Sequence, residues 1–102
     1  MEIPDVYWKA VLYVFTEAFP DDQRVWERVD LEKWSIDLEA LLGDGTFSGG
    51  EKAMLEAAAS LYNDEHMINL GDMAARLSSH YWNILTRALR IFRTGMGFHE
   101  GA

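Results

Sequence analysis

The chain has 102 residues, of which 49% are hydrophobic, and a net charge of −8 at neutral pH. This length is that of a single domain with a modest core, and it leaves little volume for a deep catalytic cavity. The absence of cysteine excludes a disulfide scaffold and a cysteine-based zinc site. No apolar run approaches the roughly 18 residues that span a bilayer, and no positively charged leader follows Met1, so we expect a soluble, cytoplasmic protein without membrane contact.

The first 20 residues predict one helix. Asp5 can cap it, and apolar residues recur at helical spacing to about Phe19. Pro20 then ends the helix.

Two further helices are expected before the glycine-rich stretch that starts at Gly43. The first is short and covers residues 23–29. Asp30 is expected to cap the second, because apolar residues after it recur at the spacing of one helical face: Leu31, Trp34, Leu38, Leu41 and Leu42.

The next helix is expected between Glu51 and Tyr62. Ser48 and Glu51 have the spacing of a capping box. The helix is rich in alanine, and small side chains let neighbouring helices approach closely. We therefore expect it to be the central and most buried helix.

Two helices are expected in the last third of the chain. Asn69 can cap a short helix over residues 70–77, and the pair of serines that follows can cap a longer one that ends at Gly95. On the longer helix we expect one apolar face, formed by Tyr81, Leu85, Ala88, Leu89 and Phe92. Ile84 and Ile91 are expected to flank this face.

The elements together predict an all-α fold. We expect a compact single-domain bundle of five to six helices over residues 1–94, with short loops and a flexible tail over residues 95–102. The only strand-like stretch, residues 66–69, is too short for a sheet of its own.

No motif in the chain carries recognisable chemistry. The glycine-rich stretch 43–52 lacks the preceding strand of a phosphate loop, and Lys52 is followed by alanine where a phosphate loop has serine or threonine. The three histidines have no spacing that would place two metal ligands on one helical face. We therefore expect no catalytic, cofactor-binding or metal-binding residues and a protein that is not an enzyme.

Charge is divided along the chain. Residues 17–44 hold nine acids and three cations, a net of −6, whereas residues 73–99 hold four arginines and no acid. An acidic surface with tryptophan is typical of a site for a basic protein partner, here formed by Asp21, Asp22, Trp26, Glu27, Asp30, Trp34 and Asp37. The commoner alternative for each tryptophan is a core anchor.

The basic residues allow two other interpretations. Residues 70–89 resemble a helix-turn-helix unit, and in a regulator that uses residues 70–93 the arginines at 87, 90 and 93 would face the phosphates of DNA. The chain departs from that pattern at three positions: Ser78 replaces the turn glycine, bulky Trp82 stands at the start of the second helix, and Arg87 takes a position that is usually buried. The net negative charge also opposes nucleic-acid binding. The same arginines are alternatively a face for a homodimer or larger homo-oligomer, or simply a solvated face: Arg76, Arg87, Arg90 and Arg93.

About half of the chain resembles a group of known small proteins. The stretches Leu41–Gly45, Phe47–Asn63, Asn69–Leu70 and Ala88–Ile91 are similar to small helical proteins of actinobacterial genomes and their phages. The resemblance implies a compact helical domain of accessory origin and transfers no site residues. We therefore expect an inhibitor or adaptor that binds a host protein, with a DNA-binding regulator or a structural homo-oligomer as alternatives.

Overall fold

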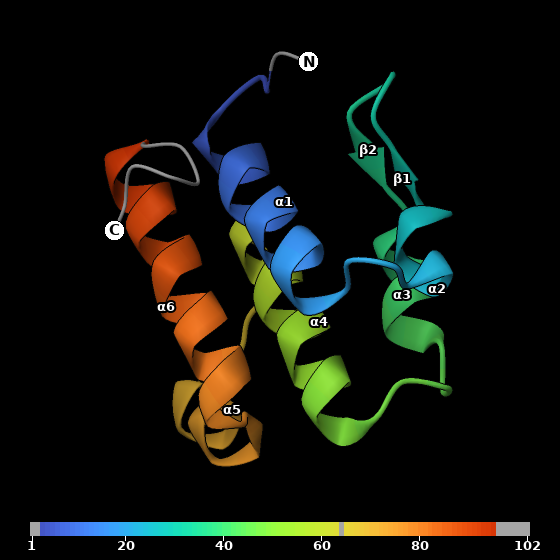
Figure 1. Ribbon diagram of the computed structural model, residues 1–102. Helices are drawn as coiled ribbons and strands as arrows, with labels where there is room; N and C mark the ends of the chain where they lie inside the picture. The colour runs from blue at the N-terminus through green and yellow to red at the C-terminus, as the bar shows by residue number, and fades with distance from the viewer. Residues whose placement is uncertain (1–2, 64, 96–102) are drawn as a thin grey trace.

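The computed structural model describes residues 3–63 and 65–95. In this part of the chain six helices surround a compact core and a small two-stranded sheet lies at one side (Figure 1). The elements are α1 (Val6–Ala18), α2 (Gln23–Trp26), β1 (Val29–Asp30), β2 (Ser35–Ile36), α3 (Leu38–Gly43), α4 (Gly49–Tyr62), α5 (Leu70–Arg76) and α6 (Ser79–Thr94). The all-α expectation is confirmed. The expected tail lies outside the described residues except for Gly95.

The helix ends follow the capping residues expected from the sequence. The Asp5 carboxylate accepts the N–H of Trp8 at 3.0 Å, which begins α1. Ser48 and Glu51 form a complete capping box at the start of α4. Each of these side chains satisfies a backbone donor that the first turn of a helix leaves unpaired.

The molecule has three layers, and α1 is the most completely buried helix. Figure 1 shows α6 on one side, α1 and α4 in the middle, and α2, α3 and the β-hairpin on the other side. Seven of the 13 residues of α1 are buried, including every residue from Ala10 to Phe15. In α4 six of 14 are buried. The expectation that α4 is the most buried helix is therefore wrong, although its alanines do pack in the core.

A β-hairpin replaces the first part of the helix expected over residues 31–42. The strands pair antiparallel, with Val29 opposite Ile36. The Asp30 carboxylate does accept N–H groups two and three residues later, as a helix cap would, but these bonds close a turn instead. Trp34 then takes a φ of 51°, which no helix contains. Asp37, and not Asp30, caps the helix that follows.

Residues 66–69, expected to be too short for a sheet of their own, are not in a strand. The short sheet lies instead at residues 29–36, where the sequence predicted only helix.

A cation–π contact and hydrogen bonds attach α2, α3 and the hairpin, which we call the outer layer, to the core. The Arg24 guanidinium lies 4.0 Å from the centre of the Phe47 ring and donates to the Thr46 carbonyl. Lys52 of α4 donates to the carbonyl of Leu42 at the end of α3. These contacts, together with buried Val25, hold α2, α3 and the hairpin in place beside α4.

Candidate interaction surfaces

Part of the negative charge of the outer layer has a structural role. The Asp22 carboxylate accepts hydrogen bonds from the backbone and the guanidinium of Arg24, and the side-chain bond lowers the pKa of Asp22. Asp44 accepts from the hydroxyl and backbone N–H of Thr46 and from Arg28 at 2.9 Å. These bonds, the Thr46 hydroxyl first, lower the pKa of Asp44 to about 2. Such carboxylates are fixed in place and are less available to a partner.

The other carboxylates of this layer are more accessible. Five acids are exposed: Asp21, Glu27, Glu32, Asp37 and Glu39. A shallow groove runs beside the hairpin, and we call it the acidic groove. Its lining residues are Glu27, Arg28, Val29, Asp30, Leu31, Glu32, Ser35 and Asp37. The groove therefore combines four carboxylates with one cation and two apolar side chains.

The two tryptophans of the expected binding surface pack inward. Trp26 is half-buried, and its indole N–H donates to the Phe19 carbonyl at 2.7 Å. Trp34 is also half-buried, and its ring meets the edge of the Trp8 ring with centroids 5.1 Å apart. Both act as anchors of the outer layer, so the acidic groove has no exposed tryptophan at its centre.

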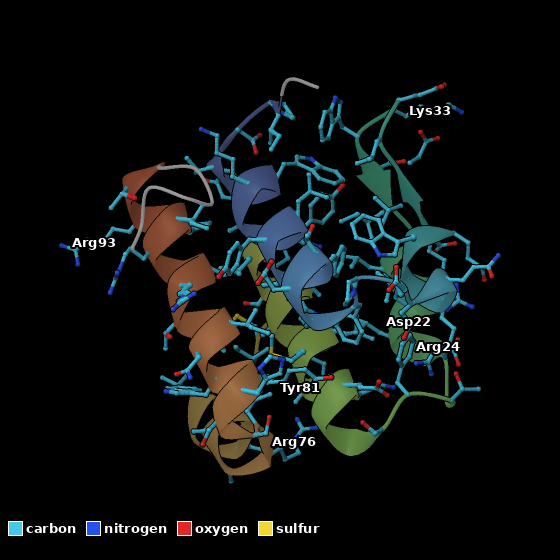
Figure 2. The ribbon with its side chains drawn as sticks, viewed as in Figure 1. Asp22, Arg24, Lys33, Arg76, Tyr81 and Arg93 are labelled. Carbon is cyan, nitrogen blue, oxygen red and sulfur yellow. The ribbon has the colours of Figure 1, made fainter. Side chains whose placement is uncertain are left out.

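The structure brings together three of the four arginines proposed as an alternative face. Arg76 lies on α5 and is ion-paired with Glu56 at 3.2 Å and with Asp72 at 2.9 Å. Arg87, Arg90 and Arg93 lie exposed on α6, and Figure 2 shows Arg93 directed away from the bundle. Arg76 therefore belongs to the contacts between α4 and α5 and not to this face.

The packing of α6 differs from the sequence expectation. Its buried residues are Ile84, Leu85, Ala88 and Ile91. Leu89, expected on the apolar face, is 44% exposed, and Trp82 is 36% exposed. The buried arc is thus rotated toward the two isoleucines expected only to flank it. When Ile84, Leu85, Ala88 and Ile91 form the buried side of the helix, helical spacing places Leu89 on the exposed side.

The helix-turn-helix interpretation finds limited support in the packing. The short helix α5 packs mainly against α4, and α6 packs mainly against α1. In a helix-turn-helix a turn of three or four residues joins the two helices, whereas only Leu77 and Ser78 lie between α5 and α6. A DNA-binding role for α6 therefore stays a prediction.

Searches for known chemistry and known relatives give no assignment. Within residues 3–63 and 65–95 no three metal-ligating side chains lie close enough to hold an ion. No helix in the same part of the chain has the length and apolar character to cross a membrane. No family model, curated protein or solved structure matches the chain. The two charged surfaces are therefore the candidate functional sites of the described residues.

Proposed function

We propose that this protein acts without catalysis, by binding a basic surface of a protein partner in the acidic groove. The observation that supports this most directly is the charge of the groove. Four lining residues are carboxylates, and Arg28, the one cation among the described lining residues, already pairs with Asp44 at 2.9 Å. A lysine or arginine from a partner would therefore meet negative charge that the protein itself does not neutralise.

Electrostatics of this kind favours fast, salt-sensitive association. A single exposed ion pair contributes only about 0 to 1 kcal/mol, so affinity requires several pairs formed together. Apolar Val29 and Leu31 offer the groove some contact area in addition to charge. A host protein with a basic nucleic-acid-binding surface suits such a groove, and an inhibitor or adaptor would compete with nucleic acid for it. A chain without cysteine is suited to the reducing cytoplasm.

The proposal is tested with a labelled peptide of about ten lysines and two variants of equal net charge. Glu27→Gln/Glu32→Gln removes two groove carboxylates, whereas Glu17→Gln/Glu65→Gln removes two exposed carboxylates elsewhere. We expect the groove variant to weaken binding about fivefold or more at low salt, and the control variant by less than about twofold. Fluorescence anisotropy measures both. Equal weakening in the two variants would show that only overall charge attracts the peptide, and would overturn the proposal.

A duplex DNA probe tests the DNA-binding alternative in the same assay. Binding at micromolar concentration that falls steeply with salt and is lost in Arg87→Ala/Arg93→Ala would favour a regulator. We expect no such binding, because the net charge of the molecule is −8.

A further inference from the structure

The exposed side of α6 carries apolar and cationic side chains in one row. Trp82, Leu89 and Arg93 are spaced by seven and four residues, which places them along one side of the helix. Trp82 is 36% and Leu89 is 44% exposed. Phe92 lies one turn from Leu89, and the centroid of its ring is 5.1 Å from that of Tyr7 on α1. Tyr7 is itself 46% exposed. Tryptophan and arginine are the residue types enriched at the centres of protein interfaces.

The charge on this surface is unbalanced. No acid occurs in α6. Within the described residues neither Arg87 nor Arg93 forms an ion pair: the ion pairs present join Arg24, Arg28 and Arg76 to carboxylates elsewhere. We call the exposed side of α6 the α6 face: Trp82, Leu89 and Arg93 form its row, and Arg87 lies on the other flank of the helix. Its natural partner is a surface with exposed carboxylates and some apolar area.

The acidic groove has both properties but lies on the opposite side of the same molecule. In Figure 1, α1 and α4 separate α6 from α2, α3 and the hairpin. In Figure 2, Arg93 lies at one edge of the molecule, whereas Lys33 and Asp22 lie toward the other. The two surfaces cannot meet within one copy. They can meet between two copies.

We propose that the α6 face of one molecule binds the acidic groove of a second copy. Arg93 then faces the groove carboxylates, Trp82 and Leu89 lie against Val29 and Leu31, and Arg87, on the other flank of α6, faces the acidic rim of the groove. The molecule measures 32 × 28 × 27 Å. One of its sides therefore offers an area of the order of the about 800 Å² per partner that a stable interface buries.

The geometry determines the kind of assembly. The two surfaces differ, so the contact is head-to-tail, and each added copy leaves one α6 face and one acidic groove open. The assembly therefore continues past two copies, as an open chain or a closed ring, and does not stop at a two-fold dimer. Because it uses the acidic groove, it competes with the basic partner proposed above. High protein concentration would thus lower the number of grooves open to that partner.

The first test measures mass by light scattering at two salt concentrations. We expect a mass above the 11.7 kDa monomer that increases with protein concentration at about 20 mM NaCl, and a monomer at about 500 mM, where charges are screened within a few ångströms. A monomer under both conditions would overturn the proposal. So would a wild-type dimer that does not grow with concentration.

The second test uses two variants that each block one end of the contact. Arg87→Gln/Arg93→Gln alters only the α6 face, and Glu27→Gln/Glu32→Gln alters only the groove. We expect each variant alone to be monomeric at low salt. An equimolar mixture should form a species of two copies and no larger one, because each variant supplies one intact surface. Lys33→Gln, which removes an exposed cation at the hairpin tip, is the control and should assemble like the wild type.

Other results separate this proposal from the proposed function. Growth that persists in the Arg87→Gln/Arg93→Gln variant would overturn self-association through α6. Binding of duplex DNA by wild type but not by that variant would assign the α6 face to nucleic acid and also overturn it. In either case the lysine-peptide assay still tests the acidic groove, since the α6 variant keeps all groove carboxylates.

Discussion

Trp34 is the one residue other than glycine with a left-handed backbone conformation among the described residues, with φ 51°. Such a conformation costs a bulky residue of the order of 1 kcal/mol or more. Its ring packs edge-on against Trp8, whose ring in turn meets Tyr62 at 5.2 Å. This aromatic contact joins the hairpin to α1 and α4, and we infer that it offsets the backbone strain.

The strain can be separated from the ring contact by comparing two substitutions. Trp34→Ala and Trp34→Gly both remove the ring, but only glycine adopts the left-handed conformation without cost. We expect both variants to be less stable than the wild type, and the glycine variant to be more stable than the alanine variant by about 1 kcal/mol. Urea unfolding measures the difference. An alanine variant as stable as the glycine variant would show that no strain is stored at this position.

Asp44 makes stability depend on pH. Its pKa is lowered from 3.8 to about 2 in the folded state, so folding favours the charged carboxylate. The stabilising contribution is complete above about pH 4 and is lost as the pH falls toward 2. We expect Asp44→Asn to be less stable than the wild type at pH 7, with a difference that shrinks between pH 4 and pH 2. Asp21→Asn, at an exposed acid, is the control in the same denaturation series and should show no such convergence.

At the scale of elements, helix ends were predictable and the hairpin was not. Caps such as Ser48 with Glu51 act within one turn, so the sequence contains all the information that places them. The hairpin depends on contacts that sequence spacing does not reveal. Leu31, Trp34 and Leu38 match a helical stripe, yet the Trp34 ring packs against Trp8, 26 positions earlier in the chain.

The glycine that ends α6 is another capping signal that acts within one turn, and it can be tested by substitution. Gly95 has a φ of 72°, its N–H donates to Ile91, and its carbonyl accepts from Lys9 of α1. A Cβ at this position would lie 3.3 Å from a methyl group of Val6. We expect Gly95→Ala to lower the free energy of unfolding by about 1 kcal/mol or more.

Gly43→Ala is the matched control for this substitution. Gly43 ends α3 at an ordinary φ, and a Cβ there would meet nothing within 4 Å. We expect that variant to be as stable as the wild type or slightly more stable, as measured by urea unfolding. A loss of stability as large as that of Gly95→Ala would mean that the left-handed cap is not the cause.

The candidate surfaces were only partly predictable for a related reason. The sequence correctly indicated an acidic and a basic region. It did not reveal which charges are already paired, because Arg28 reaches Asp44 across 16 positions and Arg76 reaches Glu56 across 20. It also placed Leu89 in the core, since a shift of the buried arc by part of a turn is decided by how α6 packs against α1. Spacing within one helix does not contain that information.

At the scale of the whole molecule, the order of the layers decides what the charges can do. The acidic and basic regions lie on opposite sides only because α1 and α4 are inserted between them (Figure 1). A sequence can show that charge is segregated along a chain but not that the two groups point away from each other. That orientation is what makes a closed pairing of the two regions within one copy impossible.

The central position of α1 also has a consequence for how the chain folds during synthesis. Its main packing partner is α6, and 60 residues separate the end of α1 at Ala18 from the start of α6 at Ser79. α1, which is apolar at every position from Ala10 to Phe15, is synthesised before α6. Contacts so distant in sequence form slowly, and an unpaired apolar helix is prone to aggregate. Until α6 is made, α4 is the main helix that can cover α1, and the side of α1 that packs against α6 stays exposed during that interval.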